Sequence, residues 1–262
     1  MNIVVCMKSV PDTTAEKRLL PDGTLDRASV AAVINPWDEY AIEEALRIRE
    51  SGAATGEIVL LCMGPENSTE TIRKGLAMGA DRAVLVADSA LHGSDMWATA
   101  RVLAAALKTL QFDIVMFGSQ STDAGGGIIY NAVAEMLGLP AVTWINEVSV
   151  QGGKVRGKRG SDVGYDVVEA PVPCVVSVTQ TANEPRYPSL PGIMKAKKKE
   201  IADHNVASLG IDASEVGLSG AKSQVTGTER PQTARANQIL KAEDPATTAA
   251  AIADFLESKK LI

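Results

Sequence analysis

The sequence predicts an α/β protein with an open, mostly parallel, doubly wound sheet, followed by an extended C-terminal arm and a last helix. Three observations support this prediction. Short runs of β-branched residues alternate with helical patterns in the first half of the chain, turn residues separate them, and the last third loses the alternation. Such alternation favours a parallel sheet, because each helix returns the chain to the edge where the next parallel strand begins.

The strands and helices of the first half follow in a regular order. We expect strands at residues 3–7, 57–63, 83–86 and 114–117, and helices at residues 37–50, 68–78, 95–110 and 128–137. Asn35-Pro36 marks the start of the first helix, because Asn favours the N-cap and the missing N–H of Pro costs nothing there. Gly52 and Gly79 are expected to end helices in a left-handed conformation.

The pattern changes after residue 140, where short alternating runs replace the strand–helix units. The runs flank a Gln151-Gly152-Gly153-Lys154 turn and predict an antiparallel hairpin near residues 142–168. A last strand is expected at residues 174–179.

The chain becomes irregular from residue 183 onward. We therefore expect an α/β domain over residues 1–190, and a recognition loop, an extended arm and a terminal helix over residues 191–262. The polar arm, at residues 205–236, cannot bury a core by itself, so we expect it to lie on a partner subunit. The helix at residues 245–259 is expected to dock there as well.

Composition and charge exclude several classes of protein. The formal net charge is -6, which disfavours binding to nucleic acid or to anionic lipid. No apolar run reaches the roughly 18–20 residues that span a bilayer, and the chain opens on a strand pattern rather than a secretory signal. Cys6, Cys62 and Cys174 form no C-x-x-C pair and suit the core of a protein in a reducing compartment. These features predict a cytoplasmic location.

The loop at residues 118–127 is the most informative candidate site. It ends in Gly125-Gly126-Gly127 just before a predicted helix, and free backbone N–H groups at a helix start suit a phosphate group. The loop is neither G-x-G-x-x-G nor a Walker A sequence. From the glycines alone, a phosphate site and a plain turn are equally good interpretations.

Catalytic residues are not indicated by the sequence. His92 and His204 lie in polar, loop-like surroundings without a partner at metal-ligand spacing. Asp12, Asp38 and Asp123 suit capping or ribose contacts better than an acid–base pair. A different kind of site is indicated at residues 187–199, where exposed apolar residues between prolines precede a lysine cluster, a pattern typical of a protein-docking anchor.

The run from Asn183 to Lys199, which contains Tyr187-Pro188-Ser189-Leu190-Pro191-Gly192-Ile193-Met194, closely resembles the signature of electron-transfer flavoprotein beta subunits. Residues 8–13, 35–46 and 75–82 match the family in order and spacing, so the resemblance covers essentially the whole chain. It implies a Rossmann-like fold of the adenine-nucleotide-binding type. It also implies a heterodimer in which an alpha subunit holds FAD, while this chain supplies one wall of that site and binds AMP in a structural role.

The resemblance also implies which residues bind the cofactor and the partner. The implied cofactor-binding residues are Cys6, Asn35, Pro36, Trp37, Asp38, Met63, Gln120, Ser121, Thr122, Asp123, Gly125, Gly126, Gly127, Ile128 and Tyr130. The implied anchor for an acyl-CoA dehydrogenase is Leu190, with Pro191, Ile193 and Met194 beside it.

Three functions follow as hypotheses. The first is an electron carrier between acyl-CoA dehydrogenases of fatty acid β-oxidation, or similar flavin dehydrogenases, and a quinone-linked acceptor. The second is an electron-bifurcating flavoprotein in which a second FAD replaces AMP and oxidises NADH. Residues 93–99 resemble that group, whereas its Asp-Gly-Asp-Thr-Ala-Gln loop is replaced here by Asp123-Ala124-Gly125-Gly126-Gly127-Ile128. The third is a nucleotide-binding sensor without redox function.

Overall fold

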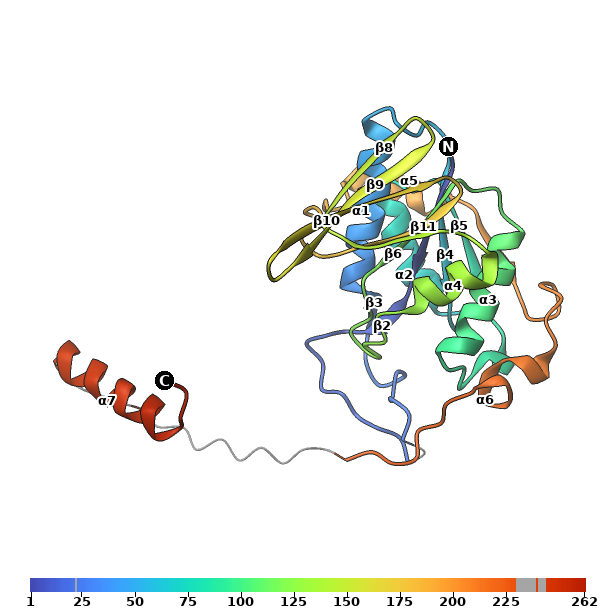
Figure 1. The fold of residues 1–262 in the computed structure, drawn as a ribbon. Coiled ribbons are helices and arrows are strands. Elements are labelled where there is room, and N and C mark those ends of the chain that lie inside the picture. The colour runs from blue at the N-terminus through green and yellow to red at the C-terminus, as the bar shows by residue number, and fades with distance from the viewer. Residues whose placement is uncertain (22, 230–238, 240–243) are drawn as a thin grey trace. The chain divides into compact units, whose positions relative to one another are not determined.

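Seven parallel strands form the centre of the molecule, in the order β12-β5-β4-β1-β6-β11-β7 (Figure 1). The structure is a computed structural model that describes residues 1–21, 23–229, 239 and 244–262. The strands are β1 (Ile3–Met7), β4 (Ile58–Met63), β5 (Arg82–Val86), β6 (Ile114–Gly118), β7 (Ala141–Ile145), β11 (Cys174–Val178) and β12 (Ile201–His204). The predicted α/β fold with a mostly parallel sheet is confirmed.

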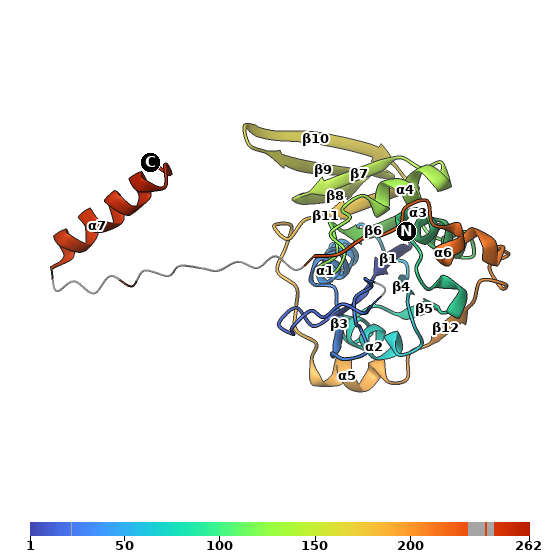
Figure 2. The ribbon, with the colours of Figure 1, turned by 90° about the horizontal axis from the view of Figure 1, so that it is seen from below.

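Both faces of this sheet are buried, as the apolar sequence of β1 requires. Ile3 and Val5 point into one core, and Val4 and Cys6 point into the other. Helices α1 (Pro36–Glu50) and α2 (Ser68–Met78) cover the first core, while α3 (Met96–Lys108) and α4 (Ile129–Leu137) cover the second. Figure 2 shows the two helix pairs on opposite sides of the sheet.

The chain reverses its direction across the sheet at β1. After β1 it builds β4 and β5 on one side, and it then crosses to place β6 on the other side. The carboxyl ends of β1 and β6 therefore flank the point where the strand order reverses, the position at which open parallel sheets usually bind ligands. A small antiparallel pair, β2 (Ser9–Pro11) and β3 (Ala32–Ile34), follows β1 there and was not predicted from the sequence.

A second, antiparallel sheet contains β8 (Glu147–Gln151), β9 (Lys154–Ser161) and β10 (Gly164–Pro171), in the order β10-β9-β8. Its first turn is the predicted one, with Gly152 and Gly153 both at positive φ. The prediction that residues 142–145 belong to this hairpin is wrong, because β7 pairs in parallel with β11 and forms an edge of the central sheet.

The compact unit that contains both sheets extends to Thr226, beyond the boundary expected at residue 190. The stretch expected to be irregular holds α5 (Leu190–Ala196) and β12, which pairs with β5. The first part of the expected arm also belongs to this unit, because Val206 and Val216 are buried in the second core. Two short helices lie in that part, η2 (Ala213–Glu215) and α6 (Gly217–Gly220), and η1 (Ser89–Leu91) precedes α3.

A second unit contains residues 227–262. Its helix α7 (Pro245–Ser258) matches the predicted terminal helix, and Asp244 caps it by accepting hydrogen bonds from the N–H groups of Ala246 and Thr247. Residues 230–236 of the expected arm lie outside the described residues. Among the described helices, none has both the length and the apolar composition that crossing a bilayer requires.

The end of β6 meets the start of α1 at Gly118. A Cβ on Gly118 would lie 2.5 Å from the carbonyl carbon and oxygen of Trp37 and 2.6 Å from Oδ1 of Asp38. Only a glycine permits this approach without moving α1 away from the sheet.

Gly118→Ala is therefore expected to lower the free energy of unfolding by ~2 kcal/mol, because the backbone of α1 must shift. Urea denaturation would measure the loss. Gly126→Ala is the matched control and should change stability little, because no heavy atom lies within 4 Å of its added Cβ. Equal effects of the two substitutions would contradict the close contact at Gly118.

Candidate functional site

The residues predicted to bind a cofactor come from segments that meet at one edge of the sheet. Strands β4, β1 and β6 are neighbours and run in parallel, so Met63, the end of β1 and the loop after Gly118 share that edge. The start of α1 joins them there through the contact at Gly118. The edge coincides with the reversal of strand order described above.

Asn35 fixes the loop that follows β6. Its side chain is buried, its Nδ2 donates to the carbonyl oxygen of Gln120 at 2.8 Å, and its Oδ1 accepts from the N–H of Thr122 at 3.2 Å. The sequence predicted that the Asn35 side chain caps α1, but it makes no such hydrogen bond. Asn35 instead holds the loop against the helix start.

Asp38 lies between the ends of β1 and β6. Its side chain is almost fully buried, and its Oδ2 accepts from the N–H of Lys8 at 2.7 Å. Burial raises the pKa of Asp38 to about 7, although hydrogen bonds from Lys8, Asn35 and Gly118 lower it in part. Asp38 therefore ties together the elements that form the site, rather than pointing into open space.

Cys6 and Tyr130 are also buried in the interior of the domain. Burial, with Asp38 nearby, raises the pKa of the Cys6 thiol well above its usual value, and the side chain packs in the second core. Tyr130 is fully buried, and its hydroxyl donates to the carbonyl oxygen of Gly127. Any contact of these two residues with a cofactor would involve the backbone nearby.

Asp123 is the centre of a charged cluster. Its Oδ1 lies 2.8 Å from Nζ of Lys8 and its Oδ2 lies 2.5 Å from Nη2 of Arg27, while Lys17 Nζ donates to the carbonyl oxygen of Thr122 at 3.1 Å. Burial alone would raise the pKa of Asp123, but the two ion pairs lower it to about 2. Lys17 and Arg27 were not predicted from the sequence, because they lie in a segment without periodicity.

The glycine loop is open beside this cluster. Gly125 and Gly127 have φ values of +62° and +63°, which other residues adopt at a cost, and a Cβ on Gly126 would meet no heavy atom within 4 Å. Ile128 is 48% exposed. The loop therefore leaves room for a group to approach its backbone closely.

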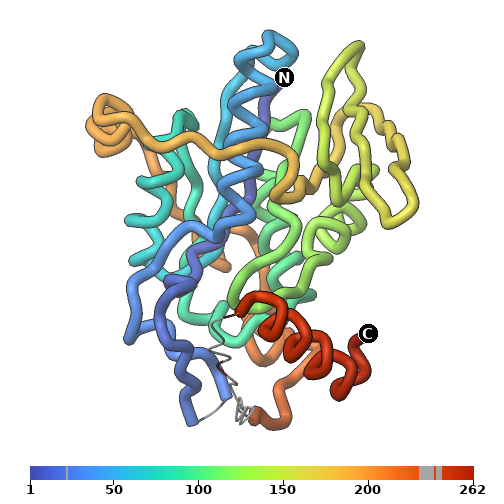
Figure 3. Tube along the Cα trace, turned by 90° about the vertical axis from the view of Figure 1, so that its left-hand side faces the viewer, coloured from blue at the N-terminus to red at the C-terminus, as the bar shows by residue number. Residues whose placement is uncertain are grey.

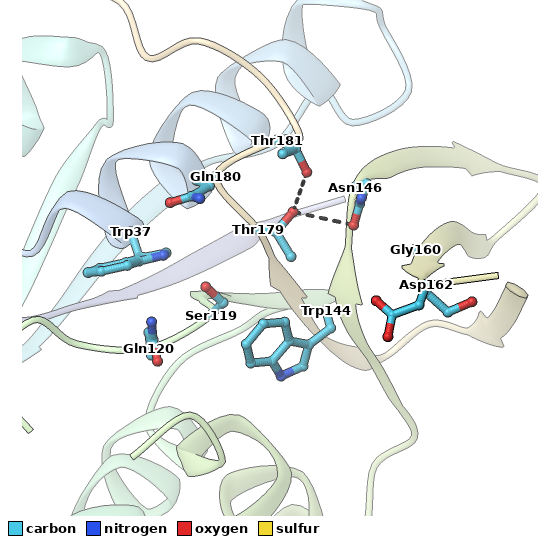
Figure 4. Close-up of a pocket in the computed structure, with 11 residues that line it drawn as sticks. Trp37, Ser119, Gln120, Trp144, Asn146, Gly160, Asp162, Thr179, Gln180 and Thr181 are labelled. Atoms are coloured by element: carbon cyan, nitrogen blue, oxygen red, sulfur yellow. Dashed lines mark hydrogen bonds between the residues drawn. The ribbon is translucent and has the colours of Figure 1, made fainter. Parts of the chain in front are cut away.

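A pocket of about 450 Å³ opens next to the loop (Figure 4). Trp37 at the start of α1 and Trp144 on β7 contribute their indoles, and Ser119 and Gln120 lie between them in this view. The other lining residues are Asn146, Gly160, Ser161, Asp162, Thr179, Gln180 and Thr181. Flat apolar rings with polar groups around them suit a planar ligand with a polar edge.

Trp144 is a lining residue that was not predicted from the sequence. Its backbone has φ +59°, its N–H donates to Oγ of Ser177 at 2.9 Å, and the residue is 44% exposed. Left-handed backbone at a bulky residue is uncommon. It interrupts the pairing of β7 with β11 and turns the indole toward the pocket.

The predicted partner-binding residues lie elsewhere on the domain. Leu190 is 80% exposed, Met194 65% and Ile193 43%, and all three belong to α5, whose N-cap Ser189 accepts from the N–H of Gly192. Figure 1 shows α5 near the end of the sheet where the N-terminus lies, whereas β2 and β3 lie at the opposite end. The anchor and the pocket are thus separate regions.

The anchor segment, which runs from Arg186 to Lys199, is attached to helices at both ends. The guanidinium of Arg186 makes two hydrogen bonds to the buried Glu43 carboxylate, at 2.7 and 2.9 Å, and two to Glu50, at 2.5 and 2.9 Å, while its backbone N–H donates to Glu43 at 3.2 Å. At the other end, Nζ of Lys199 donates to the carbonyl oxygens of Leu76 and Ala80. Figure 3 shows the segment crossing α1 before it reaches α5.

Asp38→Asn is expected to change how stability depends on pH. The folded-state pKa of about 7 lies above the ordinary value of 3.8. The folded state therefore holds this proton more tightly, and the stabilisation is complete below pH 3.8 and is lost as the pH rises through 7. Asn does not titrate, so the stability of the wild type relative to the variant should fall by roughly 2 kcal/mol between pH 5 and 8. Urea titrations at several pH values would measure the difference, and a constant difference would contradict the raised pKa.

Comparison with known proteins agrees with these features. A family described as "Electron transfer flavoprotein domain" matches residues 22–209, more than half of the chain. The electron transfer flavoprotein subunit beta of Mycobacterium leprae is 44% identical over 267 residues, covering 100% of this chain and 99% of the relative. That of Thermoanaerobacterium thermosaccharolyticum is 40% identical over 242 residues, 92% of each. The Caffeyl-CoA reductase-Etf complex subunit CarD of Acetobacterium woodii is 33% identical over the full length of both. The chain therefore belongs to the electron transfer flavoprotein family, among its beta subunits.

Proposed function

We propose that this chain is one half of a heterodimeric electron carrier, completed by an electron-transfer flavoprotein alpha subunit. The complex carries electrons from an acyl-CoA dehydrogenase, or a similar flavin dehydrogenase, to a quinone-linked acceptor. FAD bound between the subunits supplies the redox chemistry, and AMP bound by this chain has a structural role. The observation that carries the proposal is the pocket between Trp37 and Trp144, at the ends of β6, β11 and β7 beside the reversal point of the sheet.

The pocket residues fit one wall of a flavin site. The indoles of Trp37 and Trp144 offer flat apolar surface, and Gln120 and Asn146 offer amide groups at the rim. Because the pocket is open to the outside, a second subunit is needed to enclose a ring system. This chain would then position the ring and limit its access to water, without supplying an acid or a base.

The neighbouring loop fits the phosphate end of AMP. The backbone beside Gly125, Gly126 and Gly127 is accessible, and Asn35 holds the loop in place. The proposed AMP site comprises Cys6, Asn35, Pro36, Trp37, Asp38, Met63, Gln120, Ser121, Thr122, Asp123, Gly125, Gly126, Gly127, Ile128 and Tyr130. Among them, Cys6 and Tyr130 would act through the backbone and by holding the loop.

Helix α7 supports pairing with an alpha subunit. Ile252 and Phe255 are 47% and 39% exposed, they lie one turn apart, and no residue of α7 is buried. An isolated helix of this length is marginally stable in water, so packing of its apolar face is needed to maintain it. We propose that the alpha subunit covers the apolar face of α7.

The anchor segment supports docking of a dehydrogenase. Leu190, Ile193 and Met194 present exposed apolar side chains, with Pro191 in the first turn of α5 and lysines on the following residues. The Acetobacterium woodii relative is named as a subunit of a caffeyl-CoA reductase complex. A partner that acts on CoA thioesters is consistent with that name.

Cys6, Cys62 and Cys174 are free and buried, and we place the carrier in the cytoplasm, where thiols stay reduced.

The cofactor content of the complex tests this proposal. The chain should be coexpressed with its alpha subunit, and the purified complex denatured so that released FAD and AMP can be quantified by chromatography. We expect one FAD and one AMP per heterodimer. Two FAD without AMP would replace the proposal with the bifurcating, NADH-oxidising alternative. A stable chain without flavin would favour the sensor.

Leu190→Ala is expected to weaken electron transfer from the dehydrogenase while leaving the flavin content unchanged. A single apolar side chain can dominate a small transient interface, so the KM of the dehydrogenase for the carrier should rise about tenfold. Val163→Ala, at a 98% exposed position between β9 and β10, is the control and should have no effect. Unchanged kinetics of the Leu190 variant would exclude α5 as the docking site.

A further inference from the structure

Three cations converge on two consecutive residues of the glycine loop. Lys8 follows β1, whereas Lys17 and Arg27 come from the segment between β2 and β3. Lys8 and Arg27 each pair with one oxygen of Asp123, and Lys17 binds the carbonyl oxygen of Thr122. Cations from separate segments therefore meet at Thr122 and Asp123, just before Gly125.

The cluster carries excess positive charge. The side chain of Asp123 is 1% exposed and ionised, and it balances one of the two cations that contact it. Among the described acidic side chains between β2 and β3, Asp12 bonds to Thr14, Asp26 bonds to Ser29, and Glu16 pairs with Arg18 at 3.5 Å. Asp38 accepts the backbone N–H of Lys8, and the raised pKa of Asp38 reduces its charge near neutral pH.

Both cations retain donors that can reach a ligand. The side chain of Lys8 is 39% exposed and that of Arg27 is 46% exposed. An ammonium group has three N–H donors and a guanidinium group has five, and a carboxylate that contacts each through one oxygen uses a fraction of them.

The stretch from Ala124 to Ile128 lacks side-chain donors, whereas Ser121 and Thr122 earlier in the loop carry hydroxyl groups. Gly126 and Gly127 can offer backbone N–H groups, whereas the N–H of Gly125 donates to the carbonyl oxygen of Ser121 at 2.9 Å. Ala124 and Ile128 are apolar on either side of the glycines. A phosphate group bound there needs positive charge from another part of the chain, and hydrogen bonds from Lys and Arg to phosphate are among the strongest that proteins make.

We propose that Lys8 and Arg27 bind the phosphate group of the adenine nucleotide, with Asp123 as the buried counter-ion that positions both cations. This inference rests on the proposed function, and it assigns binding roles to two residues outside the predicted site. Lys17 adds a third positive charge at the same loop. The ligand class is a nucleotide with its phosphate or pyrophosphate on the glycine loop, whereas a nucleoside lacks the group that these cations recognise.

Arg27→Gln in the purified heterodimer tests the inference, with AMP, FAD and adenosine as ligands after the resident nucleotide has been removed. We expect the affinity for AMP to fall at least about tenfold and the affinity for adenosine to stay the same, because only AMP carries the phosphate. If the affinity for FAD falls together with the affinity for AMP, the site also binds a pyrophosphate group. Arg27→Lys keeps the charge and should restore part of the loss.

Arg18→Gln is the matched control, since Arg18 lies on the same segment, is exposed and pairs with Glu16 at 3.5 Å. It should leave both affinities unchanged. Equal losses for AMP and adenosine in Arg27→Gln would overturn the inference, because they would show that Arg27 merely holds the segment in place. Unchanged AMP binding would overturn it as well, with the proposed function intact. A wild-type complex that binds neither AMP nor FAD would overturn the nucleotide part of the proposed function itself.

Discussion

The close contact between Gly118 and the start of α1 sets the geometry of the corner where β1, β6 and α1 meet. Because Gly118 has no side chain, the backbone of Trp37 and the carboxylate of Asp38 lie directly against the end of β6. Asp38 can then accept the N–H of Lys8 at the end of β1, and Asn35 can reach the loop beyond β6. The three elements become one rigid corner, and the Trp37 indole faces the pocket from it.

The sequence predicted the central fold well because its signals are local. The apolar runs in β1 and β4 can be recognised without knowledge of distant contacts. The same is true of the glycines after α1 and α2, and Gly52 and Gly79 do have positive φ. Strand β12 escaped prediction because its four residues follow a lysine cluster and are fixed by pairing with the distant β5. Residues 142–145 were expected to form a strand, but in the hairpin, because nothing local indicates that the parallel partner β11 lies some thirty residues later.

The site was predicted less completely, for a related reason. The glycine loop and the start of α1 are visible as motifs, and the structure brings them together. The positive φ of Trp144 and the ion pair of Arg27 depend on tertiary structure, so neither has a signature in the sequence. Asn35 shows a further limit, because its side chain suited a helix cap and instead holds a loop 85 residues away.

Helix α1 serves two regions at once, with its first residues at the pocket and Glu43 and Glu50 holding Arg186. The anchor segment is fixed at both ends, but the side chains of Leu190 and Met194 are exposed and do not contribute to the core. Substitutions at such exposed positions leave the core unchanged. Gene duplicates can therefore diverge in the exposed face of α5 while they keep the same core and the same pocket, so that a few surface substitutions change what this face contacts.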